Sequence, residues 1–329
     1  MTRRSDQYRI IAEGAGWHDK RTRGRLRIEG RDAAAFLHAL VSNDVESLAE
    51  GRGVYAAYLT PQGRMIADLR VYRRSDHLLV DTPPSLAASL AARLDQLIFA
   101  EDARVSDVSA LLSQAGVVGG SAAAIVARAF DLDRALVESL PLRAQLAAGD
   151  ALIVRTDDAD LPSFDLFVPA VGFEAATARL AGAGAVAAGP ELVEALRIEA
   201  GRAAFGVDMT ADTIPLEAGL LDRAISTTKG CYVGQEVIVR VLHRGGGRVA
   251  KRLVRIDVEA AHADVLPAGA VLLADGREVG RVTSAAWSPR LEHGVALGYV
   301  HRDAAEVGRH LTVKAETGDV PATIVAFAG

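Results

Sequence analysis

The sequence predicts an α+β fold followed by a separate small β domain. Up to about residue 200, strand-like and helical patterns alternate irregularly, with several hairpin signals and no series of βαβ units. After residue 248 the pattern changes to short Val- and Leu-rich runs separated by Gly, Pro and Asp, which is typical of a small β-barrel or sandwich. We therefore expect an α+β region over residues 1–247 and a C-terminal β domain over residues 248–329.

Local signals define the elements of the first hundred residues. Asp32 precedes an apolar-periodic run and is placed to cap a helix. The stretch Thr60-Pro-Gln-Gly63 is a strong turn signal between two strand-like runs. The predicted elements are a strand at 25–28, a helix from Asp32 to Asn43-Asp44, strands at 54–59 and 65–72, and a helix at 85–99.

Later segments are assigned in the same way. The uncharged stretch 108–127 contains serines, a glutamine and three glycines, so we interpret it as a strand and a turn rather than a membrane span. The Ala- and Gly-rich stretch 180–190 predicts a loop, and residues 191–200 predict a helix. Six strands are predicted in the C-terminal domain, at residues 253–258, 271–273, 279–283, 295–300, 311–314 and 322–327.

Composition excludes several classes of protein. Lys plus Arg total 37 against 42 Asp plus Glu, and a net charge of −5 argues against a dedicated nucleic-acid binder. Cys231 is the only cysteine, which excludes an intramolecular disulfide and an all-cysteine metal or cluster site within one chain. The histidines show no metal-binding pairing, so no metal is expected. Without a secretory, transit or membrane-spanning signal, the expected location is the cytoplasm, away from membranes.

The most informative segment reads TTKGCYVGQE, residues 227–236. Its cysteine, Cys231, lies two residues from Lys229 and next to Tyr232, and two glycines frame it. Because glycine adopts positive φ readily, we expect a tight turn that presents Cys231. The spacing supports two interpretations: a reactive or ligand-contacting cysteine, activated by nearby cations, or a small buried hydrophobe. The neighbouring basic residues are Arg240, His243 and Arg244.

Two other patterns have simpler interpretations. Four arginines alternate in the chain and would share one face of an extended strand, a face that we expect to be solvated. The run Gly245-Gly-Gly247 lacks the ending of a phosphate loop, so we expect a flexible hairpin or an interdomain turn there. The alternating residues are Arg21, Arg23, Arg25 and Arg27.

The string Lys229-Gly-Cys-Tyr-x-Gly-Gln-Glu236 resembles the signature of the YgfZ branch of the YgfZ/GcvT folate-binding family. Members of this branch support maturation or repair of iron–sulfur enzymes and are related to the glycine-cleavage T-protein aminomethyltransferase. Residues 30–72, 197–221 and 280–299 also resemble the family's patterns, so the likeness spans nearly the whole chain. It implies two α+β lobes and a C-terminal barrel around a central channel that holds tetrahydrofolate.

The resemblance also implies a set of site residues. The family's channel carboxylate, catalytic in the aminomethyltransferases, falls on Asp68, and the acid that binds the pterin edge falls on Asp165. An arginine able to pair with folate carboxylates falls on Arg197. The implied assignments are Asp68, Asp165, Arg197 and Glu199 for tetrahydrofolate, Cys231 and Asp68 for catalysis, and the motif residues Lys229, Gly230, Cys231, Tyr232, Gly234, Gln235 and Glu236. We expect the Cys231 thiol to open onto the folate cavity.

The chain departs from the aminomethyltransferase pattern at several points. Asp157-Asp-Ala-Asp160 replaces a Gly-Tyr-Thr-Gly-Glu stretch, and the pterin-contacting glutamate becomes the shorter Asp165. Asp81-Thr-Pro-Pro84 replaces an Asn-Ala-Asn turn, and Ala67-Asp68 replaces a pair of aspartates. The aminomethyltransferases generally lack the cysteine string. These departures count against aminomethyl transfer and do not exclude a folate channel.

Three functions follow, in this order. The first is a tetrahydrofolate-binding protein that assists maturation or repair of iron–sulfur enzymes. A cubane cluster needs about four thiolates, so one cysteine implies only transient contact with iron–sulfur enzymes or assembly factors. The second is a folate-dependent aminomethyl or methyl transferase in which Asp68 orients or deprotonates the folate nitrogen. The third is a non-enzymatic adaptor with a vestigial folate channel. Enzymatic activity and oligomeric state are left open.

Overall fold

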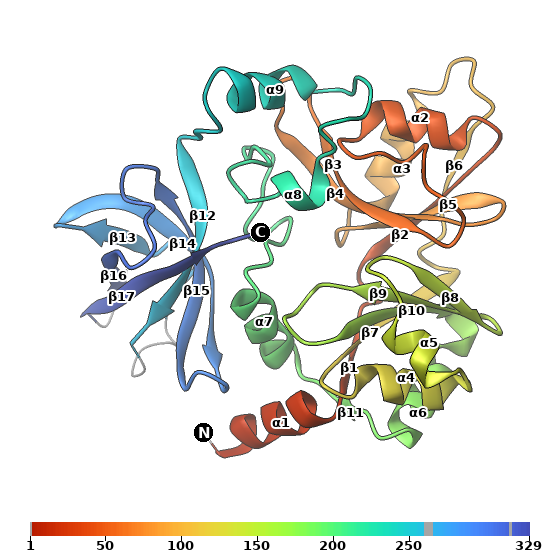
Figure 1. Cartoon of the computed structure of the whole chain (residues 1–329), viewed down its shortest axis with the longest axis horizontal. Coiled ribbons are helices and arrows are strands. Elements are labelled where there is room, and N and C mark those ends of the chain that lie inside the picture. The colour runs from red at the N-terminus through yellow and green to blue at the C-terminus, as the bar shows by residue number, and fades with distance from the viewer. Residues whose placement is uncertain (1, 260–265, 316–317) are drawn as a thin grey trace.

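The computed structural model describes residues 2–259, 266–315 and 318–329. Two α+β lobes and a β-barrel surround a central segment that carries helices α7 (Pro190–Glu199) and α8 (Leu221–Ala224) (Figure 1). The predicted α+β fold with a C-terminal barrel is confirmed. Within the described ranges, no helix has the length and apolar character needed to cross a bilayer.

The first lobe is a five-stranded antiparallel sheet in the order β3-β4-β5-β2-β6. The predicted hairpin around Thr60–Gly63 is present, and it aligns Ala57 with Asp68 and Tyr55 with Arg70. Asp32 lies at the helix N-cap, but its carboxylate accepts a hydrogen bond from the Asp102 amide at 2.8 Å instead of capping the helix. The elements are β2 (Gly24–Glu29), α2 (Ala33–Leu40), β3 (Gly53–Leu59), β4 (Met65–Arg73), β5 (His77–Thr82), α3 (Ala87–Asp95) and β6 (Arg104–Asp107).

The second lobe is a six-stranded sheet in the order β11-β1-β7-β10-β9-β8. The segment 108–127 contains the predicted strand and turn, at 112–118 and 119–121, followed by the start of a helix. The prediction of a loop over 180–190 is wrong in part, because alanine favours helix and the segment includes the end of α6 and the short β11. The elements are α1 (Thr2–Glu13), β1 (Gly16–Asp19), β7 (Leu112–Val118), α4 (Ala122–Phe130), α5 (Arg134–Glu138), β8 (Gln145–Ala148), β9 (Ala151–Thr156), β10 (Ser163–Pro169), the 3₁₀ turn η1 (Ala170–Gly172), α6 (Phe173–Gly182) and β11 (Val186–Ala187).

The two lobes are connected near the start of the chain. Strand β1 belongs to the second lobe and β2 to the first, so residues 20–23 cross from one sheet to the other. This crossing places polar side chains between the lobes, where they form part of the wall of the site described below.

The C-terminal domain is a closed barrel with the strand order β12-β15-β14-β13-β16-β17. All six predicted runs lie within its strands, and closure of the ring identifies it as a barrel and not a sandwich. Its interior is filled by aliphatic side chains such as Val254, Ile256 and Leu272. The division at residues 247/248, which falls between the end of α9 (Gln235–His243) and the start of β12, stays a prediction. The strands are β12 (Lys251–Val258), β13 (Val271–Ala274), β14 (Arg277–Ser288), β15 (His293–His301), β16 (His310–Ala315) and β17 (Gly318–Phe327).

Candidate functional site

A cavity of about 400 Å³ lies between the two lobes and α7. This volume is within the range of about 300–1,000 Å³ that is usual for small-molecule sites. Its walls come from the β1–β2 crossing, from β4, β7 and β10, and from α7 with the loop that follows it. Of the residues that the sequence assigned to a ligand, Asp68, Asp165 and Arg197 line it.

Asp68 lies on β4 and is only 6% exposed. The hydroxyl of Tyr55 donates a hydrogen bond of 2.8 Å to Oδ2 of this carboxylate. The other oxygen, Oδ1, is buried and has no hydrogen-bond partner among the described residues. A buried carboxylate oxygen without a donor is costly, so this atom is suited to a ligand that brings one.

Asp165, by contrast, is already bound within the chain. It lies on β10 and is 1% exposed. Lys20 Nζ donates to Oδ1 at 2.6 Å, and Gln114 Nε2 donates to Oδ2 at 2.9 Å. Burial raises the pKa of Asp165 above its usual range, although the Lys20 ammonium acts in the opposite direction.

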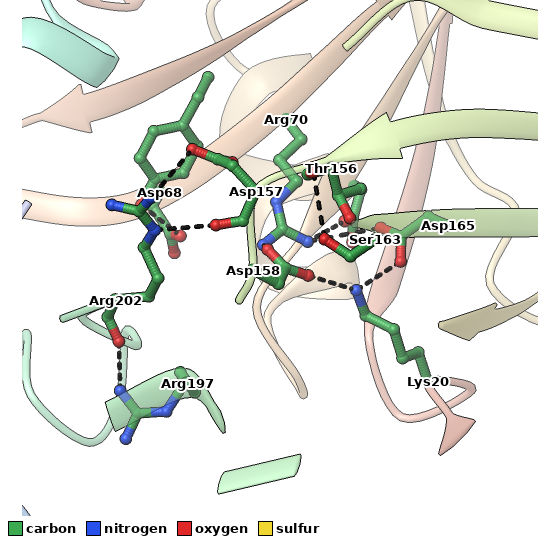
Figure 2. A network of polar contacts seen from close by, with 12 residues as sticks. Lys20, Asp68, Arg70, Thr156, Asp157, Asp158, Ser163, Asp165, Arg197 and Arg202 are labelled. Atoms are coloured by element: carbon green, nitrogen blue, oxygen red, sulfur yellow. Dashed lines mark hydrogen bonds and ion pairs between the residues drawn. The ribbon is translucent and has the colours of Figure 1, made fainter. Parts of the chain in front are cut away.

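The pair formed by Lys20 and Asp165 belongs to a larger network that joins both lobes (Figure 2). Asp158 accepts from Lys20 at 2.9 Å and from Arg70 Nη2 at 2.6 Å. Burial alone would raise the pKa of Asp158, but Arg70 and Lys20 hold it well below its usual range. Asp81 similarly lies between Arg70 at 3.2 Å and a second arginine from the β1–β2 crossing. The network therefore holds Asp158 and Asp81 in their ionised forms, with the pKa of both below the usual range.

That second arginine is Arg23, whose Nε donates to Asp81 Oδ1 at 2.6 Å. Its Nη2 is buried and unpartnered within the described part of the chain. Nδ1 of His18, another residue that lines the cavity, is likewise buried and unpartnered within the described residues. The His18 ring packs directly against Gly116, because a Cβ added at Gly116 would lie 2.2 Å from a ring atom. Burial lowers the pKa of His18 to about 4, so its imidazole is neutral at physiological pH. Arg23, His18 and Asp68 thus each bring one unpartnered polar atom to the cavity wall.

Arg197 is the α7 residue that the resemblance assigned to the ligand. It lines the cavity, but its guanidinium is bound to Glu194, to the Arg202 carbonyl, to Asp208 at 2.6 Å and to Ser284 at 2.8 Å. In this arrangement Arg197 joins α7 to the barrel as well as forming part of the wall.

Glu199 does not lie among the residues that line the cavity. Residues two apart on a helix point in different directions, and Glu199 points to the barrel instead. Its carboxylate accepts hydrogen bonds from Ser288 Oγ at 2.5 Å and from Arg290 Nε at 2.8 Å. The structure therefore gives Glu199 a role in docking the barrel and does not bring it to the cavity.

The cysteine motif lies elsewhere, where the chain leads into α9. Lys229 Nζ donates to the carbonyl oxygens of His38 and Val41, the latter at 2.7 Å, near the C-terminus of α2. Its ammonium lies 5.1 Å from the centre of the buried Tyr232 ring. Burial lowers the pKa of Lys229 to about 8 and raises the pKa of Tyr232 to about 12.

Cys231 is exposed, so its interpretation as a small buried hydrophobe is wrong. The expectation that its thiol opens onto the cavity is also not met, because no residue of the motif lines it. Gly234 does adopt a positive φ of 85°, and it packs against Thr60 in the β3–β4 turn. Gln235 and Glu236 follow as the first residues of α9. The predicted turn is present, but it presents the thiol at the surface of the first lobe.

The alternating arginines do not form a solvated strand face. Arg25 is 1% exposed because β2 is an interior strand between β5 and β6, and its Nη2 donates to the Ser109 carbonyl at 2.8 Å. Arg21 lies in the turn before β2 and pairs with Asp19 at the surface.

Several residues of the site were not assigned from the sequence. Lys20, Tyr55 and Gln114 carried no local signal. Arg23 and Asp158 were noted only as parts of an arginine pattern and an acidic run. The remaining network members are Arg70 and Asp81.

The structure thus combines a cavity between two α+β lobes, a buried network of acids and bases in the cavity wall, and a C-terminal barrel packed on α7. The chain belongs to the glycine cleavage T-protein family: the GCVT N-terminal domain matches residues 3–229, and the glycine cleavage T-protein C-terminal barrel domain matches residues 251–328.

Relatives over the full chain agree with this assignment. The chain is 30% identical to an aminomethyltransferase of Saccharopolyspora erythraea, over 98% of this chain and 88% of the relative. It is 29% identical to an aminomethyltransferase of Geobacillus kaustophilus, over 97% and 88%. A crystal structure of the glycine cleavage system aminomethyltransferase T from Bartonella henselae superposes with a TM-score of 0.87 at 22% identity, covering 98% of this chain and 88% of that one, and shows the same fold.

Proposed function

We propose that the cavity binds tetrahydrofolate and that the protein is a folate-dependent one-carbon transferase of the aminomethyltransferase type. Similarity along nearly the whole chain to relatives named aminomethyltransferase supports this function over the iron–sulfur role that the cysteine motif first predicted. The observation that carries the proposal is Asp68, buried in the cavity wall with Oδ1 unpartnered.

Asp68 has the chemistry that the reaction needs. Tyr55 fixes one carboxylate oxygen, which leaves Oδ1 to accept a hydrogen bond or a proton from a nitrogen of the ligand. Tetrahydrofolate, when bound, would supply the nitrogen atoms that take up a one-carbon unit. The network around Lys20, Arg70 and Asp158 would hold the cavity wall in a fixed arrangement around the ligand.

The test is a turnover assay with purified protein, tetrahydrofolate and aminomethyl donors. We expect formation of methylene-tetrahydrofolate with release of the donor nitrogen as ammonia, and loss of this activity in Asp68→Asn. The asparagine amide oxygen still accepts from Tyr55, so the variant should fold. Asp95→Asn, at the exposed end of α3, is the matched control and should retain activity. No turnover by the wild type with any of these donors would overturn the proposal, as would full activity of Asp68→Asn.

A second candidate function is support of iron–sulfur enzymes, as in the YgfZ branch. The exposed Cys231, held on a turn that Lys229 ties to α2, favours it, because a partner protein can reach this thiol. The test is deletion of the gene, followed by assays of a radical-SAM enzyme or a dehydratase under oxidative stress. We expect loss of activity that the wild-type gene restores and Cys231→Ser does not. Unchanged activity after deletion, or full rescue by Cys231→Ser, would exclude this function.

The third function, an adaptor with a vestigial channel, makes a different prediction. Calorimetry would then show no tetrahydrofolate binding, while binding to an iron–sulfur partner would be retained. Folate binding by the wild type would remove this alternative.

A further inference from the structure

We propose that Arg23 contacts the ligand and sets the specificity of the cavity, by donating from Nη2 to a ring carbonyl oxygen while Asp68 accepts from an adjacent N–H. The inference rests on the proposed function, since the ligand is taken to be a reduced pterin. It adds a residue that the family resemblance did not assign.

Asp165, the acid that the family resemblance assigns to the pterin edge, is already hydrogen-bonded within the chain. Both oxygens of Asp165 accept hydrogen bonds from within the chain, one from Lys20 at 2.6 Å and one from Gln114 at 2.9 Å. Arg70 Nη1 lies 3.6 Å from the same carboxylate. A ligand that displaced Lys20 would leave a buried ammonium without one of its two carboxylates, which is unfavourable. Asp165 is an acceptor, so recognition of a ring carbonyl falls to donor groups elsewhere in the wall.

Arg23 and Asp68 each have one polar atom that is free to form a hydrogen bond with a ligand. Both residues line the cavity, and Nη2 of Arg23 and Oδ1 of Asp68 are buried without partners among the described residues. They also lie near each other, because Arg23 bonds to Asp81, which the strand register places opposite Arg70, and Asp68 lies two residues before Arg70 on the same face of β4. Arg23 is held in place from its other side by the hydrogen bond from Nε to Asp81 at 2.6 Å.

The free atoms of Arg23 and Asp68 are chemically complementary to one edge of a reduced pterin ring. A guanidinium N–H can only donate, and an ionised carboxylate can only accept. A fixed donor near a fixed acceptor matches a ring edge on which a carbonyl oxygen lies beside a ring N–H. A 4-oxo tetrahydropterin has this edge at O4 and N5–H, and N5 is one of the nitrogens that the proposed reaction uses. A 4-amino analogue would instead point an N–H group at Arg23, so that two donors face each other unpaired, and sites of this kind reject such analogues strongly.

The experiment is a calorimetric titration of tetrahydrofolate and of 4-amino-4-deoxytetrahydrofolate into three proteins. The wild type should bind the 4-oxo ligand at least tenfold more tightly, as expected for a hydrogen bond to a charged group. In Arg23→Lys, the ammonium can still pair with Asp81 but lacks Nη2, so most of this preference should be lost. Arg21→Lys, which changes a surface pair with Asp19 on the same segment, should keep the wild-type ratio.

The outcomes separate this inference from the proposed function. If the wild type binds neither ligand, the proposed function fails before Arg23 is tested. If it binds tetrahydrofolate but shows equal affinity for the two ligands, the inference about Arg23 is wrong, even if Arg23→Lys does not fold. An unchanged ratio in a folded Arg23→Lys also overturns it.

Discussion

The hydroxyl of Tyr55 and the carboxylate of Asp68 lie on one face of the β3–β4 hairpin and share a hydrogen bond of 2.8 Å. The strand register pairs Tyr55 with Arg70, so Asp68 is its diagonal neighbour, within reach of a long side chain. Burial, together with Asp68, raises the pKa of Tyr55 well above its usual range. Tyr55 therefore remains a donor at any working pH and fixes which carboxylate oxygen faces the ligand.

Tyr55→Phe removes this donor and leaves both oxygens of Asp68 buried and unpartnered. We expect the free energy of unfolding to fall by about 1–3 kcal/mol, measured by urea denaturation. Tyr232→Phe is the matched control, because within the described ranges the Tyr232 hydroxyl forms no hydrogen bond, and its effect should be smaller. Equal losses in the two variants would contradict the prediction.

Lys20→Met breaks the buried pairs with Asp158 and Asp165. At pH 7 we expect a loss of about 3–5 kcal/mol in the free energy of unfolding, because Asp165 remains buried without its ammonium partner and Asp158 keeps only Arg70. Lys314→Met, which breaks an exposed pair with Asp319, should cost no more than about 1 kcal/mol. A similar loss in both variants would be inconsistent with the network described here.

The loss caused by Lys20→Met should also depend on pH. The pKa of Asp165 is already raised and would rise further without Lys20. In the variant, ionised Asp165 therefore destabilises the folded state above that pKa, and protonation at lower pH removes this cost. The pKa of Asp158 is lowered by Lys20 and Arg70, and its stabilising effect is present at neutral pH and disappears as pH falls through that lowered value. Asp158 is therefore ionised at both pH 4 and pH 7, and the Asp165 effect makes the loss smaller at pH 4 than at pH 7; urea midpoints at the two values test this.

Gly234→Ala tests the turn that precedes α9. Gly234 has φ of 85°, and a Cβ would meet the Thr60 carbonyl oxygen at 2.5 Å. Gly246 has a comparable φ of 58°, with no atom within 4 Å of its Cβ position. We expect Gly246→Ala to cost about 1 kcal/mol and Gly234→Ala roughly 2–4 kcal/mol, from thermal or urea unfolding. Identical effects would mean that the close contact with Thr60 is unimportant.

Cys231 should react with a maleimide reagent in the native protein, at a stoichiometry of one per chain and without denaturant, because its side chain is exposed. Since Cys231 does not line the cavity, tetrahydrofolate should leave the labelling rate unchanged. Mass spectrometry of the labelled protein gives both results. Protection by folate would show that the thiol lies in the site, and labelling only in denaturant would contradict its exposure.

The parts of the fold with strong local signals were predictable. The Thr60–Gly63 turn and the six barrel strands follow from turn residues and short apolar runs near one another in the chain. Asp68 was found because an acid between Ala67 and Leu69 in an apolar strand needs a reason to be there, and the family resemblance supplied one.

The rest of the site depends on contacts between distant parts of the chain. Lys20 pairs with Asp165 across 145 positions, and Arg23 pairs with Asp81 across 58. No local pattern shows that these side chains meet, since the contact is created by the crossing of the chain between the lobes. The same cause explains Arg25, which looked solvated in the alternating series but is covered by the segment around Ser109.

Helix α7 belongs physically to two parts of the molecule. One side of it lines the cavity through Arg197, and the other is fastened to β14 and its following turn by the bonds from Arg197 to Ser284 and from Glu199 to Ser288 and Arg290. An engineered chimera that exchanged only residues 251–328 for a relative's barrel would sever these attachments. The natural unit for such a transplant is therefore the barrel together with α7, although the two are separated by some fifty residues of sequence.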